Sequence, residues 1–206
     1  MRVRTDEKRQ AIMDAASAAF GEMGYERASM AAIARRAGAS KQTLYSYFES
    51  KEELFSAVML EAMASQAEAL FDLLNVEASD LKTTLEAFGR AYIDFVTSPE
   101  VLNLTRVAVT EGGQGTLGPR LYSHGPMRGW GAVAANLERW AREGQLAVDD
   151  ARIAALHLKG LLEAGLVEPG LYGATAAVSR DDAARHGVRI FLAGYRPAAH
   201  PQADPS

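Results

Sequence analysis

The chain has 206 residues and a hydrophobic fraction of 48%, which is enough to build the core of a domain of ordinary size. It contains no cysteine, which excludes disulfides, thiolate metal ligands and a cysteine nucleophile. The net charge is −4, but residues 1–51 carry nine Lys and Arg against six Asp and Glu, a net +3, and the remainder carries −7. This asymmetry is typical of a protein whose first segment meets phosphate groups.

Apolar residues recur every three or four positions along nearly the whole chain, and no segment shows the alternation of a strand. The first three predicted helices span residues 6–23, 29–36 and 40–47. Serines at N-cap positions and glycines at helix ends mark their limits, namely Ser29, Ser40, Gly24 and Gly38.

A capping box at Ser50 and Glu53 predicts a long helix from Lys51 to about Leu74. Further helices are predicted over residues 81–95, 99–111, 117–143, 149–167 and 179–195, with Asp149 as a cap. Pro126 predicts a kink or a break within 117–143. The sequence therefore predicts an all-α protein of about nine helices.

Residues 29–48, "SMAAIARRAGASKQTLYSYF", have the pattern of a helix-turn-helix. If Leu44 lies at the centre of the buried face of the second helix, Phe48 lies on the same side. Hydrogen-bonding side chains on either side of Leu44 then point away and can meet base edges or phosphates; they are Gln42, Thr43, Tyr45 and Ser46. No Asp or Glu occurs between residues 27 and 48, where a carboxylate would repel DNA.

The block "FGEMGYERASMAAIARRAGASKQTLYSYFESKEELFSAV" resembles the DNA-binding head of the TetR/AcrR family of transcriptional regulators over residues 8–60. The run T-L-Y-x-x-F-x-S-K-E-E-L carries most of this resemblance. Later, "FVTSPEVLNLTRVAV" and "REGQLAVDDARIAALHLKGLL" resemble the AefR-like branch. The resemblance implies a DNA-binding domain at residues 1–50, a helical ligand-binding and dimerisation domain at 51–196, and a disordered tail at 197–206.

The resemblance also implies the residues that contact DNA. Tyr45 and Lys51 match positions that bind phosphate, and Gln42 stands where the family often has Gly. Because Gln can pair with adenine through two hydrogen bonds, we expect Gln42 to read a base. The complete predicted set is Ser29, Lys41, Gln42, Thr43, Tyr45, Ser46, Tyr47 and Lys51.

In the second domain the resemblance implies a ligand cavity among the middle helices and a two-fold dimer formed by the last two. The predicted ligand-binding residues are Phe88, Tyr92, Arg106, Tyr122, Met127, Trp130, His157 and Glu163. Each of these aromatic residues alone is more often a core residue, and the charged ones are equally consistent with salt bridges. The predicted dimer residues are Ile153, Leu156, Leu161, Val188, Phe191 and Leu192.

Other motifs carry no function in this interpretation. "GQGTLG" at residues 113–118 matches a dinucleotide-binding pattern, but a predicted helix precedes it and Pro119 follows, so we expect a loop. The four histidines lack metal-ligand spacing. We expect no catalytic residue, cofactor, metal site or membrane span, and a cytoplasmic bacterial protein that associates with the nucleoid when bound to DNA.

The sequence thus predicts a homodimeric repressor that binds a palindromic operator and is released by a small, mostly apolar molecule. Two alternatives stay open: an all-α enzyme, and a ligand-binding dimer that has lost DNA binding. A bound cofactor or metal would favour the enzyme, and the intact segment from Lys41 to Tyr47 argues against the second alternative.

Overall fold

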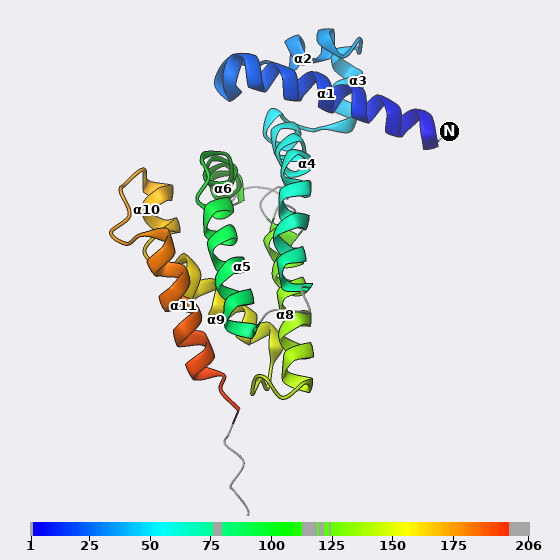
Figure 1. Cartoon of the computed structure of the whole chain (residues 1–206). Coiled ribbons are helices and arrows are strands. Elements are labelled where there is room, and N and C mark those ends of the chain that lie inside the picture. Colours follow the sequence, from blue (N-terminus) through cyan, green and yellow to red (C-terminus); the bar gives the residue numbers. More distant parts are fainter. Residues whose placement is uncertain (1, 76–79, 113–118, 120–121, 124, 198–206) are drawn as a thin grey trace, which may run out of the picture. The chain divides into compact units, whose positions relative to one another are not determined.

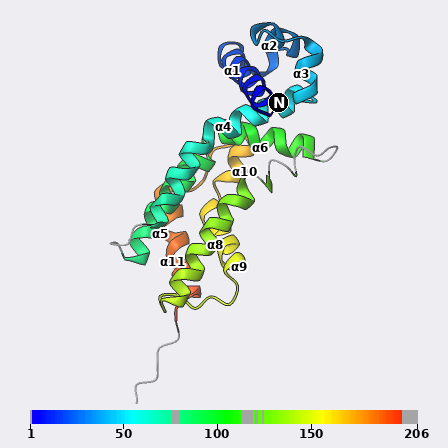
Figure 2. The same ribbon diagram turned by 90° about the vertical axis from the view of Figure 1, so that its right-hand side faces the viewer.

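The structure is a computed structural model that describes residues 2–75, 80–112, 119, 122–123 and 125–197. Within these ranges it contains ten α-helices and no β-strand, which confirms the all-α prediction (Figures 1 and 2). The elements are α1 (Arg2–Arg27), α2 (Met30–Arg36), α3 (Lys41–Tyr47), α4 (Lys51–Asp72), the 3-10 helix η1 (Leu73–Asn75), α5 (Leu81–Val96), α6 (Pro99–Gly112), α8 (Pro126–Arg142), α9 (Ala151–Glu163), α10 (Val167–Tyr172) and α11 (Arg180–Gly194).

The chain forms two compact units. The N-terminal unit comprises Met1–Ser65 with Val107–Leu121, and the C-terminal unit comprises Gln66–Arg106 with Tyr122–Ser206. Two helices therefore pass from one unit to the other along the chain, α4 after Ser65 and α6 after Arg106.

The N-terminal unit is built from α1, α2, α3 and the first turns of α4. The predicted end of the first helix at Gly24 corresponds to a break in α1, where the backbone takes φ 75° and ψ 164°. Such a positive φ favours glycine because it has no Cβ. The core of this unit includes Ile12, Ile33, Leu44 and Leu54, all fully buried.

The C-terminal unit is a bundle in which α11 packs on α5 and α9, and α8 packs on α9. Its core includes the fully buried Phe88, Leu137 and Leu158. The approach of α11 to α9 is close at Gly187, where an added Cβ would lie 3.1 Å from the carbonyl oxygen of Leu161. The small residue therefore sets the distance between these two helices.

The break predicted at Pro126 within the helix over 117–143 is confirmed. Gly125 takes φ −99° and ψ −93°, and α8 begins with the proline at its first position, where it needs no N–H donor. Two other predictions differ from the structure. The cap predicted at Asp149 is Asp150, whose carboxylate accepts from the amides of Arg152 and Ile153. The helix predicted to reach residue 167 ends at Glu163, and α10 follows it as a separate helix.

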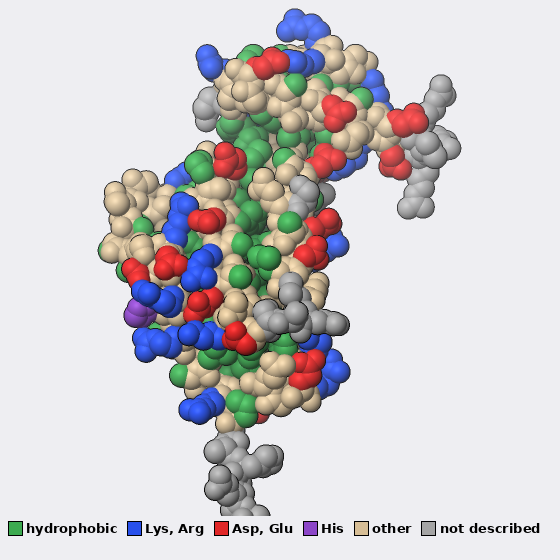
Figure 3. All heavy atoms as spheres, in the orientation of Figure 1, with side chains coloured by type: hydrophobic (Ala, Val, Ile, Leu, Met, Phe, Trp, Pro, Cys, Tyr) green, Lys and Arg blue, Asp and Glu red, His purple; other side chains and the backbone are tan. Residues whose placement is uncertain are grey.

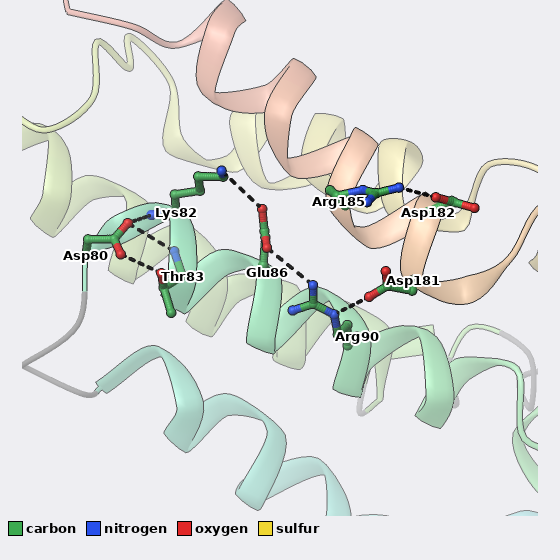
Figure 4. Close-up of polar contacts among 8 residues, drawn as sticks. All are labelled: Asp80, Lys82, Thr83, Glu86, Arg90, Asp181, Asp182 and Arg185. Atoms are coloured by element: carbon green, nitrogen blue, oxygen red, sulfur yellow. Dashed lines mark hydrogen bonds and ion pairs between the residues drawn. The ribbon is translucent and has the colours of Figure 1, made fainter.

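On the surface of the C-terminal unit, ion pairs join α5 to the start of α11. Figure 4 shows that Arg90 lies between Glu86 and Asp181, and its Nε is 2.6 Å from an Asp181 oxygen. Figure 3 shows acidic and basic side chains interspersed over this face. Because these pairs are exposed, each contributes little to stability, but together they align the two helices.

By length and composition alone, the helical stretch Lys51–Asn75 could cross a membrane. Its apolar residues serve both cores instead, since Leu54 and Phe55 are buried in the N-terminal unit and Leu70 and Leu74 in the C-terminal unit. The predicted loop at residues 113–118 and the tail from residue 198 lie outside the described residues.

Candidate functional site

The predicted helix-turn-helix is present, and local hydrogen bonds define its turn. Ser29 caps α2 by accepting from the Ala32 amide at 3.2 Å, and Ser40 caps α3 by accepting from the Thr43 amide at 3.0 Å. Between the helices, Gly38 takes φ 55° and the Ala39 amide donates to the Ala34 carbonyl at 2.9 Å. This is a Schellman motif, and it reverses the chain after α2 with a left-handed glycine.

One side of α3 is buried and the other is exposed. Leu44 is fully buried, and Phe48, the C-cap, is 2% exposed. The predicted DNA-contacting side chains lie on the outer side: Lys41, Gln42, Tyr45 and Ser46 are exposed, and Thr43 and Tyr47 are half-buried. Tyr47 packs partly against the core of the unit.

Some of these polar groups already have local partners. The Thr43 hydroxyl pairs with the Ser40 hydroxyl at 2.8 Å, and the Ser46 hydroxyl donates to the Thr43 carbonyl at 2.7 Å. The Lys41 ammonium lies over the Tyr45 ring, 5.7 Å from its centroid. The Gln42 amide has no side-chain partner among the described residues, so it is available for a base edge.

Lys51, predicted to bind phosphate, has intramolecular contacts. Its ammonium donates to the Tyr25 carbonyl at 3.1 Å and lies 4.2 Å from the centroid of the Tyr25 ring. The Tyr25 hydroxyl in turn donates to Glu52 at 2.7 Å. Lys51 therefore joins the start of α4 to the end of α1. A lysine has three N–H donors, so a phosphate contact remains a prediction.

Arg36 and Glu22 tie α2 to α1 through two hydrogen bonds of 2.7 Å. These bonds lower the pKa of the Glu22 carboxyl and raise the pKa of the Arg36 guanidinium, so each group favours the charged form of the other. Arg35, the preceding residue, is exposed on α2. Both arginines are therefore at the surface, and Arg36 is the one that joins α2 to α1.

In the C-terminal unit, four of the eight predicted ligand-binding residues form one connected cluster. The ring of Phe88 stacks on that of Tyr92 at 5.9 Å, and Trp130 meets Tyr92 edge-on at 5.0 Å. The Tyr92 hydroxyl accepts from Trp130 Nε1 at 3.3 Å and donates to Glu163. Lys159 pairs with the other Glu163 oxygen at 2.5 Å. Burial, and then the charge of Glu163, raise the pKa of the Tyr92 phenol well above its ordinary range.

The other four predicted ligand-binding residues lie elsewhere. Arg106 donates to the carbonyls of Leu171 and Gly170, at the end of α10. His157 pairs with the Tyr195 hydroxyl at 2.6 Å. Tyr122 and Met127 are 52% and 57% exposed. The predicted ligand set is therefore not one constellation, and an open depression of about 350 Å³ beside α8 and α9 includes none of the eight.

Two family profiles match this chain. The profile of bacterial regulatory proteins of the TetR family matches residues 12–58, which contain the helix-turn-helix. The profile of the AefR-like transcriptional repressor C-terminal domain matches residues 83–197, more than half of the chain. The chain belongs to the TetR family of transcriptional regulators. This assignment confirms the resemblance in both halves and excludes the enzyme alternative, because the family and its fold are those of regulators.

Relatives of this TetR-family chain are similarly described. It is 37% identical over 95 residues to the transcriptional activator FasR of Mycolicibacterium smegmatis, covering 46% of this chain and 43% of FasR. A putative TetR-family regulator from Mesorhizobium loti is 29% identical, with a TM-score of 0.76 over 93% of this chain and 98% of that one. The flavonoid-responsive regulator FrrA is 28% identical, with a TM-score of 0.68 over 94% of this chain and 100% of FrrA.

TetR-family regulators usually bind DNA as dimers, and the six predicted dimer residues can be sorted by exposure. Ile153 and Leu156 on α9 are 51% and 52% exposed, and Leu161 and Leu192 are half-buried. Val188 and Phe191 are at most 1% exposed, so they belong to the core of one subunit and correct the predicted set. Ile190 on α11, which is 51% exposed, was outside that set. The exposed face of α9 and α11 thus carries three large apolar side chains, namely Ile153, Leu156 and Ile190.

Proposed function

We propose that this TetR-family chain is a repressor that binds a palindromic operator as a homodimer and is released by a small, mostly apolar molecule. The observation that carries the proposal is the two-sided character of α3. Its buried side anchors it through Leu44, and its outer side presents amide and hydroxyl groups without a carboxylate. Such a helix can enter the major groove, which is about 12 Å wide.

Within this interface the roles follow from reach and chemistry. Gln42, at the exposed N-terminal turn of α3, is the base-reading residue. Lys41, whose ammonium lies over the Tyr45 ring, and Tyr45 itself bind DNA phosphates from the exposed face of α3. Ser29, Thr43, Ser46, Tyr47 and Lys51 complete the contact set. Local hydrogen bonds of Ser29, Thr43, Ser46 and Lys51 fix the shape of this surface before DNA binds.

The dimer contact is formed by α9 and α11 through Ile153, Leu156 and Ile190. Three large apolar side chains, each about half exposed, are costly to leave in water, and a second copy of the chain covers them. In such a dimer the two copies of α3, the recognition helices, lie about 34 Å apart or slightly more. This distance matches two half-sites of a palindrome on successive turns of the DNA helix.

The effector site is centred on the cluster of Phe88, Tyr92, Trp130 and Glu163. Three aromatic rings provide apolar surface, and the carboxylate accepts a hydrogen bond from a hydroxyl group. The similarity to FrrA, which is described as flavonoid-responsive, supports a planar, hydroxylated aromatic effector. Its binding requires the rings to separate, so the cluster rearranges when the effector enters.

The test is selection of DNA from a random-sequence library by the purified protein, followed by sequencing. An enriched palindrome that the protein protects in a footprint supports operator binding, and no enrichment contradicts it. A reporter fused to that operator then separates repression from activation, which matters because FasR is described as an activator. Adding hydroxylated aromatic compounds to the complex tests release. If no hydroxylated aromatic compound releases the DNA and purely aliphatic compounds do, the proposed effector class is wrong.

A further inference from the structure

Two consecutive cations of α1 contact the turn that precedes the recognition helix α3 and the C-cap that ends it. The Lys8 ammonium donates to the carbonyls of Ala37 and Gly38, at 3.3 and 3.0 Å. These carbonyls belong to the turn that leads into α3. The Arg9 guanidinium lies over the ring of Phe48, 5.2 Å from its centroid, at the C-cap of α3. Neither cation belongs to the set of residues predicted to contact DNA.

The two turn carbonyls accept hydrogen bonds from Lys8 and not from backbone amides of the described residues. The backbone amides of the turn donate to carbonyls of α2: the Gly38 amide donates to the Arg35 carbonyl, and the Ala39 amide donates to the Ala34 carbonyl. No backbone amide in the described part of the chain donates to the carbonyls of Ala37 or Gly38. A charged donor at this position also offsets the negative end of the α2 dipole. Lys8 therefore stabilises the turn in one geometry.

The turn geometry decides how α3 is presented. The segment from Gly38 to Ser40 connects α2 to α3, and a rotation there would redirect Gln42 away from the base that it reads. Lys8 is half-buried, and its hydrogen bond to the Ala37 carbonyl is partly shielded from water, whereas the bond to the Gly38 carbonyl is exposed. Arg9 restrains the other end of the same helix through a cation–π contact.

We propose that Lys8 is a positioning residue for operator recognition, acting through the α2–α3 turn, with Arg9 as its weaker counterpart at the far end of α3. The inference rests on operator binding by the proposed repressor and extends it to a residue of α1. It differs from a phosphate contact because Lys8 acts through the two turn carbonyls to which it donates.

The experiment compares the wild type with Lys8→Met, Lys8→Gln and Lys8→Arg. The charge-matched control is Lys82→Met, on α5 of the C-terminal unit. Affinity is measured for the duplex selected by the wild type and for an unrelated duplex of equal length, over a range of salt. Lys8→Met is expected to weaken binding to the selected duplex about tenfold and to the unrelated one less than about threefold. Lys8→Arg, which keeps the charge and the donors, should restore most of the loss.

Hydrogen exchange without DNA gives a second readout. Lys8→Met should speed exchange at the Gly38 and Ala39 amides, while Lys82→Met should leave them unchanged. Thermal melting of each variant shows whether it folds. If Lys8→Met does not fold, Lys8→Gln, which keeps a polar end group, replaces it in both measurements.

Three results would overturn the inference. Equal weakening on both duplexes, with the salt slope reduced by about 0.9, would make Lys8 a phosphate contact. Unchanged affinity for the selected duplex would deny it any role in recognition. Unchanged hydrogen exchange at the Gly38 and Ala39 amides would show that Lys8 does not stabilise the turn. This measurement needs no DNA, so it tests the role of Lys8 in the turn even if the wild type selects no sequence and the proposed function fails.

Discussion

The hydroxyl of Tyr92 donates a hydrogen bond to the carboxylate of Glu163, which joins α5 to α9 across the C-terminal unit. The two residues are 71 positions apart in sequence. Tyr92 is 6% exposed, and the Glu163 side chain is 17% exposed. A charged acceptor with so little access to water depends on the donors that the protein supplies, which are Tyr92 and Lys159.

Removing this donor should destabilise the fold. We expect Tyr92→Phe to lower the free energy of unfolding by about 1–3 kcal/mol, because the Glu163 carboxylate loses a buried partner. Urea unfolding measures the change. Tyr172→Phe is the matched control, since Tyr172 is 82% exposed and should change stability by less than about 0.5 kcal/mol. Equal stability of Tyr92→Phe and the wild type would show that water replaces the lost donor.

The raised pKa of the Tyr92 phenol predicts a loss of stability in alkaline solution. In the unfolded chain the phenol loses its proton near pH 10, whereas burial and Glu163 keep it protonated in the folded state. The unfolded state therefore binds fewer protons above about pH 10, and stability falls as the pH rises. Below that pH the contribution is fully present. Between pH 8 and 11 the free energy of unfolding should fall more steeply for the wild type than for Tyr92→Phe. Parallel curves for the two proteins would contradict the raised pKa of Tyr92.

Mutations on the exposed face of α3 should separate residues that recognise a base from residues that bind phosphate. Gln42→Ala should reduce discrimination at one base pair of the selected operator by about 1–3 kcal/mol. Tyr45→Phe should weaken binding to all single-base variants alike, because a phosphate contact carries no sequence information. Binding to a panel of such variants provides the measurement. If Gln42→Ala left every relative affinity unchanged, another residue would read the base.

The exposed face of α9 and α11 should control assembly. Leu156→Asp and Ile190→Asp each place a charge where a partner would bury an apolar side chain, and each should raise the dimer dissociation constant at least about 30-fold. Sedimentation velocity at micromolar concentration gives the state of assembly. Val109→Asp is the control, because Val109 is 71% exposed on α6. A wild type that sediments as a monomer would end the dimer proposal.

The close approach at Gly187 should tolerate no side chain. Gly187→Ala places a Cβ about 3.1 Å from the Leu161 carbonyl oxygen, so α11 must move away from α9. We expect a loss of about 1–3 kcal/mol in unfolding free energy. Gly131→Ala on α8 meets nothing within 4 Å and should stabilise the protein by about 0.5–1 kcal/mol, because alanine favours the helix. Two variants of equal stability would contradict this packing argument.

The amino-acid sequence by itself determined the features that depend on neighbours three or four residues away. The caps at Ser29 and Ser40 are confirmed, because a serine hydroxyl reaches only the amides of the next turn. The turn at Gly38 and the two-sided character of α3 follow from equally short-range patterns. The family assignment succeeded for the same reason, since the helix-turn-helix motif is contiguous in the chain.

Only the tertiary structure decided which distant residues meet. The sequence contains α10 as "VEPGLY", whose proline and glycine are poor helix formers; its end is held by Arg106, about 64 residues earlier. The same periodic pattern marks Ile190 and Phe191, yet one is exposed and the other buried, because packing of α11 against α5 and α9 fixes its rotation. Lys8 was not recognised, since its contacts to the α2–α3 turn cross 29 and 30 positions of sequence. Such contacts exist only after the helices have packed.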